Sequence, residues 1–92
     1  ATDIMTSANE FTLEGRLLVY PNPARTEIAV DPQGTVIKTY SITDLSGRML
    51  KTGNPETKHT FKINISDLSP GIYLLRAFVA GNLSYIHKIN KL

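Results

Sequence analysis

The chain of 92 residues contains no cysteine and no tryptophan, and it has only two histidines. Without cysteine, the chain can form neither a disulfide nor a thiolate metal site, so packing alone must stabilise the fold. No apolar run approaches the roughly 20 residues that a membrane-spanning helix needs. The first residues lack the basic and apolar segments of a secretory signal peptide. We expect the chain to be the end of a longer protein.

The histidines do not predict a reaction centre. His59 and His87 have no cysteine, second histidine or carboxylate at a metal-ligand spacing. The serines lack the G-x-S-x-G context of a hydrolase nucleophile. No glycine-rich loop opens a helix, as a phosphate site requires. We therefore expect no enzyme activity, no metal and no cofactor.

Charge is distributed unevenly along the chain. The formal net charge is +2, yet residues 1–44 hold three basic and six acidic side chains, and residues 45–92 hold seven basic and two acidic ones. No acidic residue follows Asp67. A basic end of this kind either faces solvent or meets acidic groups of a partner. We do not expect nucleic acid as that partner.

From Arg16 onward, apolar residues recur at a spacing of two, and glycine, proline, asparagine or aspartate closes each run. This pattern predicts short β-strands joined by turns. Before Arg16, residues 1–15 show no sustained period, so we interpret them as a linker with some order around Phe11 and Leu13. The expected strands are residues 16–20, 26–31, 35–44, 48–53, 58–65, 71–80 and 83–91.

The strand at residues 71–80 is apolar on both faces, so we place it in the middle of a sheet. The strand containing Phe61, Ile63 and Ile65 alternates with Lys62 and Asn64, as expected for a sheet with one face on the core. About seven short strands with frequent turns predict an all-β fold: a single immunoglobulin-like antiparallel β-sandwich. A partly open barrel is the alternative architecture.

Three segments stand out beyond this pattern. Pro21-Asn22-Pro23 ends an apolar run, and its prolines fix φ and remove two backbone donors. We expect a rigid bend or a strand switch there.

The second segment contains Leu68, Pro70, Gly71 and Tyr73. We expect Leu68 to fill the core, Pro70-Gly71 to form a tight turn, and the Tyr73 hydroxyl to bond back to the loop, as in a tyrosine corner. Fibronectin type III domains have a similar pattern, with one more residue before the tyrosine.

The third segment is the terminal strand, which ends in Lys88-Ile89-Asn90-Lys91-Leu92. Alternation places Lys88 and Asn90 on one face and Ile89 and Lys91 on the other. An edge strand protected by solvated lysines is the simplest interpretation. Asn64 and Asn82 begin N-x-S patterns, which we interpret as chance matches.

In this order and close to the chain's end, these segments resemble the type A C-terminal sorting domain of the type IX secretion system of Bacteroidetes. The resemblance covers residues 16–92 and includes the turn from Asp44 to Arg48 with Gly47. It differs at Asn90, where the family usually has an apolar residue. It assigns the sorting motif to Pro21, Asn22, Pro23, Gly47, Leu68, Pro70, Gly71, Tyr73, Lys88 and Lys91.

The resemblance also implies a function. The domain would follow a cargo protein, fold in the periplasm and be recognised by the type IX translocon. At the cell surface, a sortase-like peptidase would remove it by cleavage within residues 1–15. Recognition by strand addition to the last strand is one mechanism. A freed edge strand could also form a weak homodimer.

Two other classes of function stay open on the sequence. The chain could be an immunoglobulin-like or fibronectin-like adhesion or spacer module of a secreted enzyme. It could also be a carbohydrate-binding sandwich, which needs a row of exposed aromatic side chains. Four tyrosines and three phenylalanines are present, and alternation places most of them on core faces.

Overall fold

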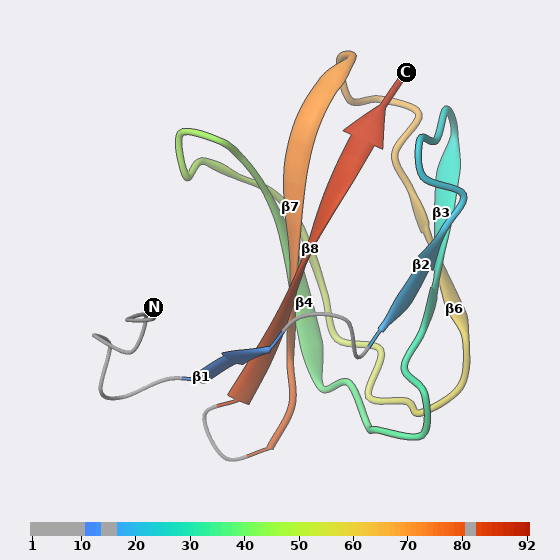
Figure 1. Ribbon diagram of the computed structural model, residues 1–92, viewed down its shortest axis with the longest axis vertical. Coiled ribbons are helices and arrows are strands. Elements are labelled where there is room, and N and C mark those ends of the chain that lie inside the picture. The colour runs from blue at the N-terminus through green and yellow to red at the C-terminus, as the bar shows by residue number, and fades with distance from the viewer. Residues whose placement is uncertain (1–10, 14–16, 81–82) are drawn as a thin grey trace.

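The structure is a computed structural model that describes residues 11–13, 17–80 and 83–92 (Figure 1). Its elements are β1 (Phe11–Leu13), β2 (Leu18–Tyr20), β3 (Glu27–Asp31), β4 (Thr39–Asp44), β5 (Met49–Gly53), β6 (Phe61–Asn64), β7 (Gly71–Phe78) and β8 (Leu83–Lys91). Strands β2 to β8 correspond to the seven expected from the sequence. The short β1 falls inside the expected linker, at the residues where we expected some order. No helix in the described part of the chain is long and apolar enough to cross a membrane.

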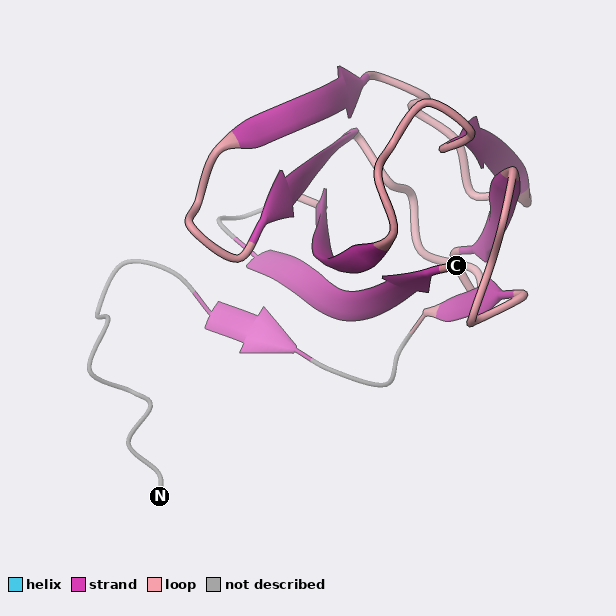
Figure 2. Cartoon of the chain, turned by 90° about the horizontal axis from the view of Figure 1, so that it is seen from above, coloured by secondary structure: helices cyan, strands magenta, loops and turns pink. Residues whose placement is uncertain are grey.

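The strands form two sheets that face each other, as Figures 1 and 2 show. One sheet has the order β1-β8-β7-β4-β5, and the other has the order β2-β3-β6. All neighbouring strands are antiparallel except β1, which runs parallel to β8. The prediction of an all-β sandwich is confirmed, and the barrel alternative is wrong because the described strands fall into two separate sheets.

The strand predicted to be central lies in the middle of the larger sheet. β7 pairs with β8 on one side and with β4 on the other. Its residues Tyr73, Leu75 and Ala77 are buried, and the residues between them are only half-buried. A strand with neighbours on both sides and apolar residues on both faces is typical of the interior of a sheet.

The core lies between the two sheets and consists mainly of aliphatic side chains. Ile28 and Val30 of β3, Ile42 of β4, and Leu75 and Ile89 of the larger sheet have essentially no exposed surface. β-Branched side chains are stiff and pack well on a pleated surface, so they suit this layer. Without disulfides, this layer supplies most of the stability.

The expected strand at residues 35–44 is too long at its start. β4 begins at Thr39, and Ile37 forms only a single bridge to Thr57. The preceding turn explains the delay: Gln33 and Gly34 both have positive φ, and the Thr35 amide bonds back to the Pro32 carbonyl. The chain therefore reaches the sheet several residues later than alternation alone suggests.

Candidate functional site

The Pro-Asn-Pro segment forms the bend between β2 and β3. Both X-Pro bonds in it, Tyr20-Pro21 and Asn22-Pro23, are cis. β2 ends at Tyr20, where the first proline removes a backbone donor. Before β3 begins, Ala24 forms a parallel bridge to Lys91 of the larger sheet. The predicted bend is confirmed, and it brings the chain from one sheet against the end of the other.

Asn22 joins this bend to the terminal strand. Its Nδ2 donates to the Lys88 carbonyl oxygen at 2.8 Å, and its Oδ1 accepts from the Asn90 amide at 2.9 Å. A side-chain amide has one donor side and one acceptor side, so it can occupy the position of a neighbouring strand's peptide group. Asn22 takes the place of such a peptide group at the outer edge of β8, the edge that does not pair with β7.

Backbone bonds continue the pairing beyond Asn22. The Ala24 amide donates to the Asn90 carbonyl at 2.9 Å, and the Leu92 amide donates to the Ala24 carbonyl at 2.8 Å. We call these four hydrogen bonds, made by Asn22 and Ala24 to residues 88–92, the terminal clip. At the other end of the strand, β1 pairs with Leu83–Tyr85.

The terminal strand is therefore not a free edge strand, and the edge-strand interpretation is wrong. β7 pairs with one side of β8 from Ser84 to Lys91. The other side is covered by β1 near Leu83 and by the terminal clip near Asn90. Sequence alternation could not detect this covering, because it depends on residues more than 60 positions away. In this fold, strand addition to the end of β8 would first have to displace the clip.

The two lysines of the terminal strand differ in exposure. The predicted alternation is confirmed, since Lys88 and Asn90 are exposed and Ile89 and Lys91 are buried. Lys91 is only 8% exposed, and its Nζ donates to the Leu92 carbonyl oxygen at 3.1 Å. Of these two lysines, only Lys88 has an exposed side chain.

Lys91 contributes instead to a charged group at the end of the sandwich. Lys51 Nζ donates to Asp67 at 3.1 Å, and this bond is the main cause that lowers the pKa of the Asp67 carboxyl. The charges of Lys51 and Lys91 lower it further. The charge of Lys91 therefore acts on Asp67 of the same domain.

The Pro-Gly turn lies at the same end of the fold. Leu68 is half-buried and packs against the core, whereas Pro70 is exposed. Gly71 has a φ of +154°, a region that favours glycine. The Tyr73 hydroxyl donates to the Ser69 carbonyl oxygen at 2.5 Å, so the predicted tyrosine corner is confirmed.

This turn is in register with the terminal strand. Gly71 pairs with Lys91, and Tyr73 pairs with Ile89. The bend, the Pro-Gly turn and the terminal residues, which are distant in sequence, are therefore neighbours in space. Figure 1 shows the end of β8 and the start of β7 together at the top of the sandwich.

The turn between β4 and β5 occupies the same end of the larger sheet, because Asp44 pairs with Tyr73. Asp44 Oδ1 accepts from the Ser46 amide, the Ser46 hydroxyl and the Arg48 amide at 2.9, 2.6 and 3.0 Å. The Ser46 hydroxyl bond is the main cause that holds the pKa of Asp44 below its usual value. Gly47 takes a φ of +94°, which the turn requires.

A shallow groove lies beside the terminal clip. Pro21, Pro23, Arg25 and Leu92 contribute to its lining. Leu92 is 48% exposed, so this groove adds apolar surface to the end of the fold. The remaining predicted site, a cleavage point within residues 1–15, lies outside the described residues except for Phe11–Leu13.

Other candidate groups do not assemble into a site. His59 is exposed, and His87 Nδ1 lies 3.3 Å from the Lys88 carbonyl oxygen. Within residues 11–13, 17–80 and 83–92, no three metal-ligating side chains are grouped so that they could hold an ion. Asn64 Oδ1 accepts two bonds from Ser66, and Asn82 lies outside the described residues.

The aromatic side chains do not form an exposed row on the described surface. Tyr73 and Tyr85 are buried, and the rings of Tyr40 and Phe61 stack on each other at 5.8 Å. Tyr20, at 49% exposure, is the one aromatic residue among the exposed large hydrophobic residues of the described chain. A carbohydrate-binding platform needs several such rings, so the structure does not support that alternative.

A comparison with known protein families matches the same segments that the structure brings together. A family model described as a secretion system C-terminal sorting domain matches residues 18–91. A search of curated proteins gives no match. The family match covers all three segments that meet at the end of the sandwich, and it confirms the resemblance drawn from the sequence.

Proposed function

We propose, from the premise that this chain belongs to the family of secretion system C-terminal sorting domains, that its signal is presented by the folded end of the sandwich. A type IX sorting domain is a C-terminal signal on a secreted cargo protein, not a catalytic domain. It directs the cargo across the outer membrane toward the cell surface or the medium. The proposal concerns how this chain presents that signal.

The terminal clip is the observation that carries the proposal. Asn22 bonds to Lys88 and Asn90 and so fixes the terminal strand against the bend. A sorting signal must have the same shape whatever cargo precedes it. A clipped strand in a self-contained sandwich meets that requirement, because its geometry depends only on contacts inside the domain.

In this proposal, the partner recognises side chains rather than a free strand edge. Lys88 and Asn90 are exposed, and they lie beside the Pro-Asn-Pro bend. The translocon would bind this end of the folded domain in the periplasm. A sortase-like peptidase would then cleave within residues 1–15, which precede the matched region. Strand addition would follow only if the clip opened.

An export assay tests the function. Residues 1–92 are fused to the C-terminus of a periplasmic fluorescent reporter in a host with a type IX system, with and without residues 88–92. We expect the reporter at the cell surface or in the medium only with the full tail. The proposal would be contradicted if circular dichroism showed a folded domain and the reporter stayed in the periplasm with the full tail as well as with the shortened tail. That result would favour the adhesion or spacer module instead.

A further inference from the structure

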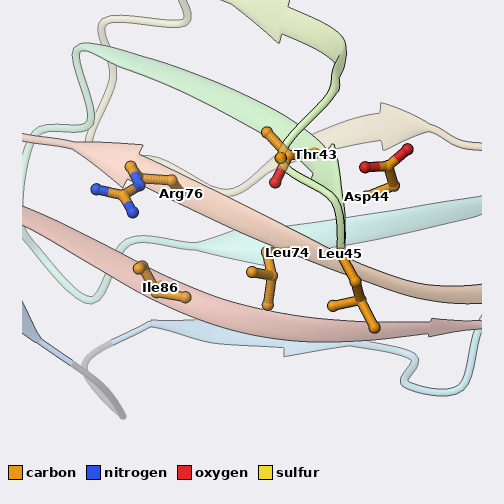
Figure 3. A pocket seen from close by; sticks show the side chains of 7 residues that line it. Thr43, Asp44, Leu45, Leu74, Arg76 and Ile86 are labelled. Atoms are coloured by element: carbon orange, nitrogen blue, oxygen red, sulfur yellow. The ribbon is translucent and has the colours of Figure 1, made fainter.

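The outer face of the larger sheet carries an apolar groove. On β7, Tyr73, Leu75 and Ala77 face the core, so Leu74 and Arg76 point to the opposite side. Leu45 from the β4–β5 turn and Ile86 from β8 line the groove together with Leu74. Figure 3 shows these three side chains with Arg76 at one end and Asp44 at the other.

This face is more apolar than an outward sheet face usually is. Leu45 is 67% exposed and Met49 is 60% exposed, while Leu74 and Ile86 are half-buried. The solvent face of an antiparallel sheet normally carries polar side chains. Contiguous apolar surface rimmed by polar residues is typical of a binding site.

The charges around the groove are predominantly basic. Strands β7 and β8 contain Arg76, Lys88 and Lys91 and no acidic residue. Lys88 is exposed and pairs in register with Leu74, so its side chain lies on the groove's face. Lys91 faces the core instead.

The one carboxylate that lines the groove is already engaged. Asp44 Oδ1 accepts three hydrogen bonds, and its Oδ2 lies 3.4 Å from Arg48 Nε. Arg48 therefore balances the negative charge of Asp44, and the exposed Lys88 supplies positive charge on the same face. A partner of complementary charge is therefore acidic.

We propose that the groove is a docking surface for an extended protein segment that carries apolar side chains flanked by carboxylates. An apolar side chain of the segment packs among Leu45, Leu74 and Ile86, and a carboxylate pairs with Lys88. The inference rests on the proposed function and deepens it by assigning a chemistry to the export partner. Lys88 belongs both to this surface and to the strand held by the terminal clip.

The export assay tests this surface by changing exposed residues outside the core. Leu45→Ser removes apolar surface from the groove, and Lys88→Glu reverses its charge. The matched controls are Leu18→Ser and Lys58→Glu, because Leu18 is 50% exposed on the other sheet and Lys58 is exposed in a loop. Thermal unfolding of each variant checks that the domain is folded.

We expect Leu45→Ser and Lys88→Glu each to lower the exported fraction about tenfold, the loss of about 1.4 kcal/mol of binding. Both controls should export like the unmodified tail. Export of all four variants at the unmodified level would overturn the inference and leave the proposed function intact. Failure of the unmodified tail itself would overturn the proposed function and this inference together.

A second measurement distinguishes a protein segment from an anionic membrane surface. Amide chemical shifts of the 92-residue chain are recorded with phosphatidylglycerol vesicles and with phosphatidylcholine vesicles. We expect no change at Leu45, Leu74 or Ile86 with either. Shifts at these residues with phosphatidylglycerol alone, abolished by Leu45→Ser, would assign the groove to a lipid surface and overturn the proposed protein partner.

Discussion

Asn22 and Asn90 are hydrogen-bonded across 68 positions of sequence, from a side-chain oxygen to a backbone amide. With its other amide atom, Asn22 holds the Lys88 carbonyl. One exposed side chain thus fixes two peptide groups of the terminal strand. The Pro-Asn-Pro motif and the terminal motif are two parts of one structure.

The first prediction concerns this side chain. Asn22→Ala removes two hydrogen bonds, each worth about 0.5–1.5 kcal/mol net, and should lower the free energy of unfolding by about 1–2 kcal/mol. The Asn90 amide should also exchange with solvent faster, because it loses its acceptor. Urea unfolding and hydrogen exchange measure the two effects. Asn54→Ala, at an exposed loop position, is the control and should change neither.

The second prediction concerns the tyrosine corner. Tyr73→Phe deletes the hydroxyl that bonds to the Ser69 carbonyl and should destabilise the domain by about 1 kcal/mol. Tyr20→Phe, at a ring that is 49% exposed, should have little effect. Equal urea midpoints for both variants and the unmodified chain would show that the corner does not stabilise the fold.

The third prediction concerns Gly47. Its φ of +94° is unfavourable for an L side chain, although a Cβ atom added there would meet no other atom within 4 Å. Gly47→Ala should therefore lose about 1–2 kcal/mol through backbone strain alone. Gly47→Asn should lose less, because asparagine tolerates positive φ. A larger loss for asparagine would contradict the backbone explanation.

The fourth prediction concerns acid sensitivity. The pKa of Asp44 is lower in the folded state than its usual value of 3.8, mainly through the Ser46 hydroxyl. Its contribution to stability is therefore present above that pH and is lost as the pH falls through the folded-state pKa. Asp44→Asn removes this titrating carboxyl, so the free energy of unfolding should fall less steeply as the pH is lowered through the acid range.

NMR titration checks the cause of that shift. Ser46→Ala removes the main hydrogen bond to Asp44 and should raise the pKa of its carboxyl toward 3.8. An unchanged titration curve would assign the shift to the backbone bonds instead.

Local chemistry is sufficient to predict most of the fold. Period-two alternation locates β3, β6 and β7, and the apolar character of both faces of β7 places it centrally. The tyrosine corner is predictable because its donor and acceptor, Tyr73 and Ser69, are four residues apart.

The terminal clip is not predictable, because it joins residues 66 and 68 positions apart through one side chain. Alternation correctly predicts that Lys88 and Lys91 lie on opposite faces of β8. It cannot show that β8 is covered on its outer edge, so the pattern alone favours a free edge strand. Strand coverage is a property of tertiary pairing, which a single strand's pattern does not contain.

The export of two destabilised variants tests whether the clipped terminal strand is the signal. Tyr73→Phe is expected to lose about 1 kcal/mol and Asn22→Ala about 1–2 kcal/mol, but only Asn22→Ala weakens the clip, from four hydrogen bonds to the two made by Ala24. In the reporter fusion, we predict that Asn22→Ala lowers export and that Tyr73→Phe, with the clip intact, exports like the unmodified tail. Equal export of the two variants would contradict a role for the clip beyond stability.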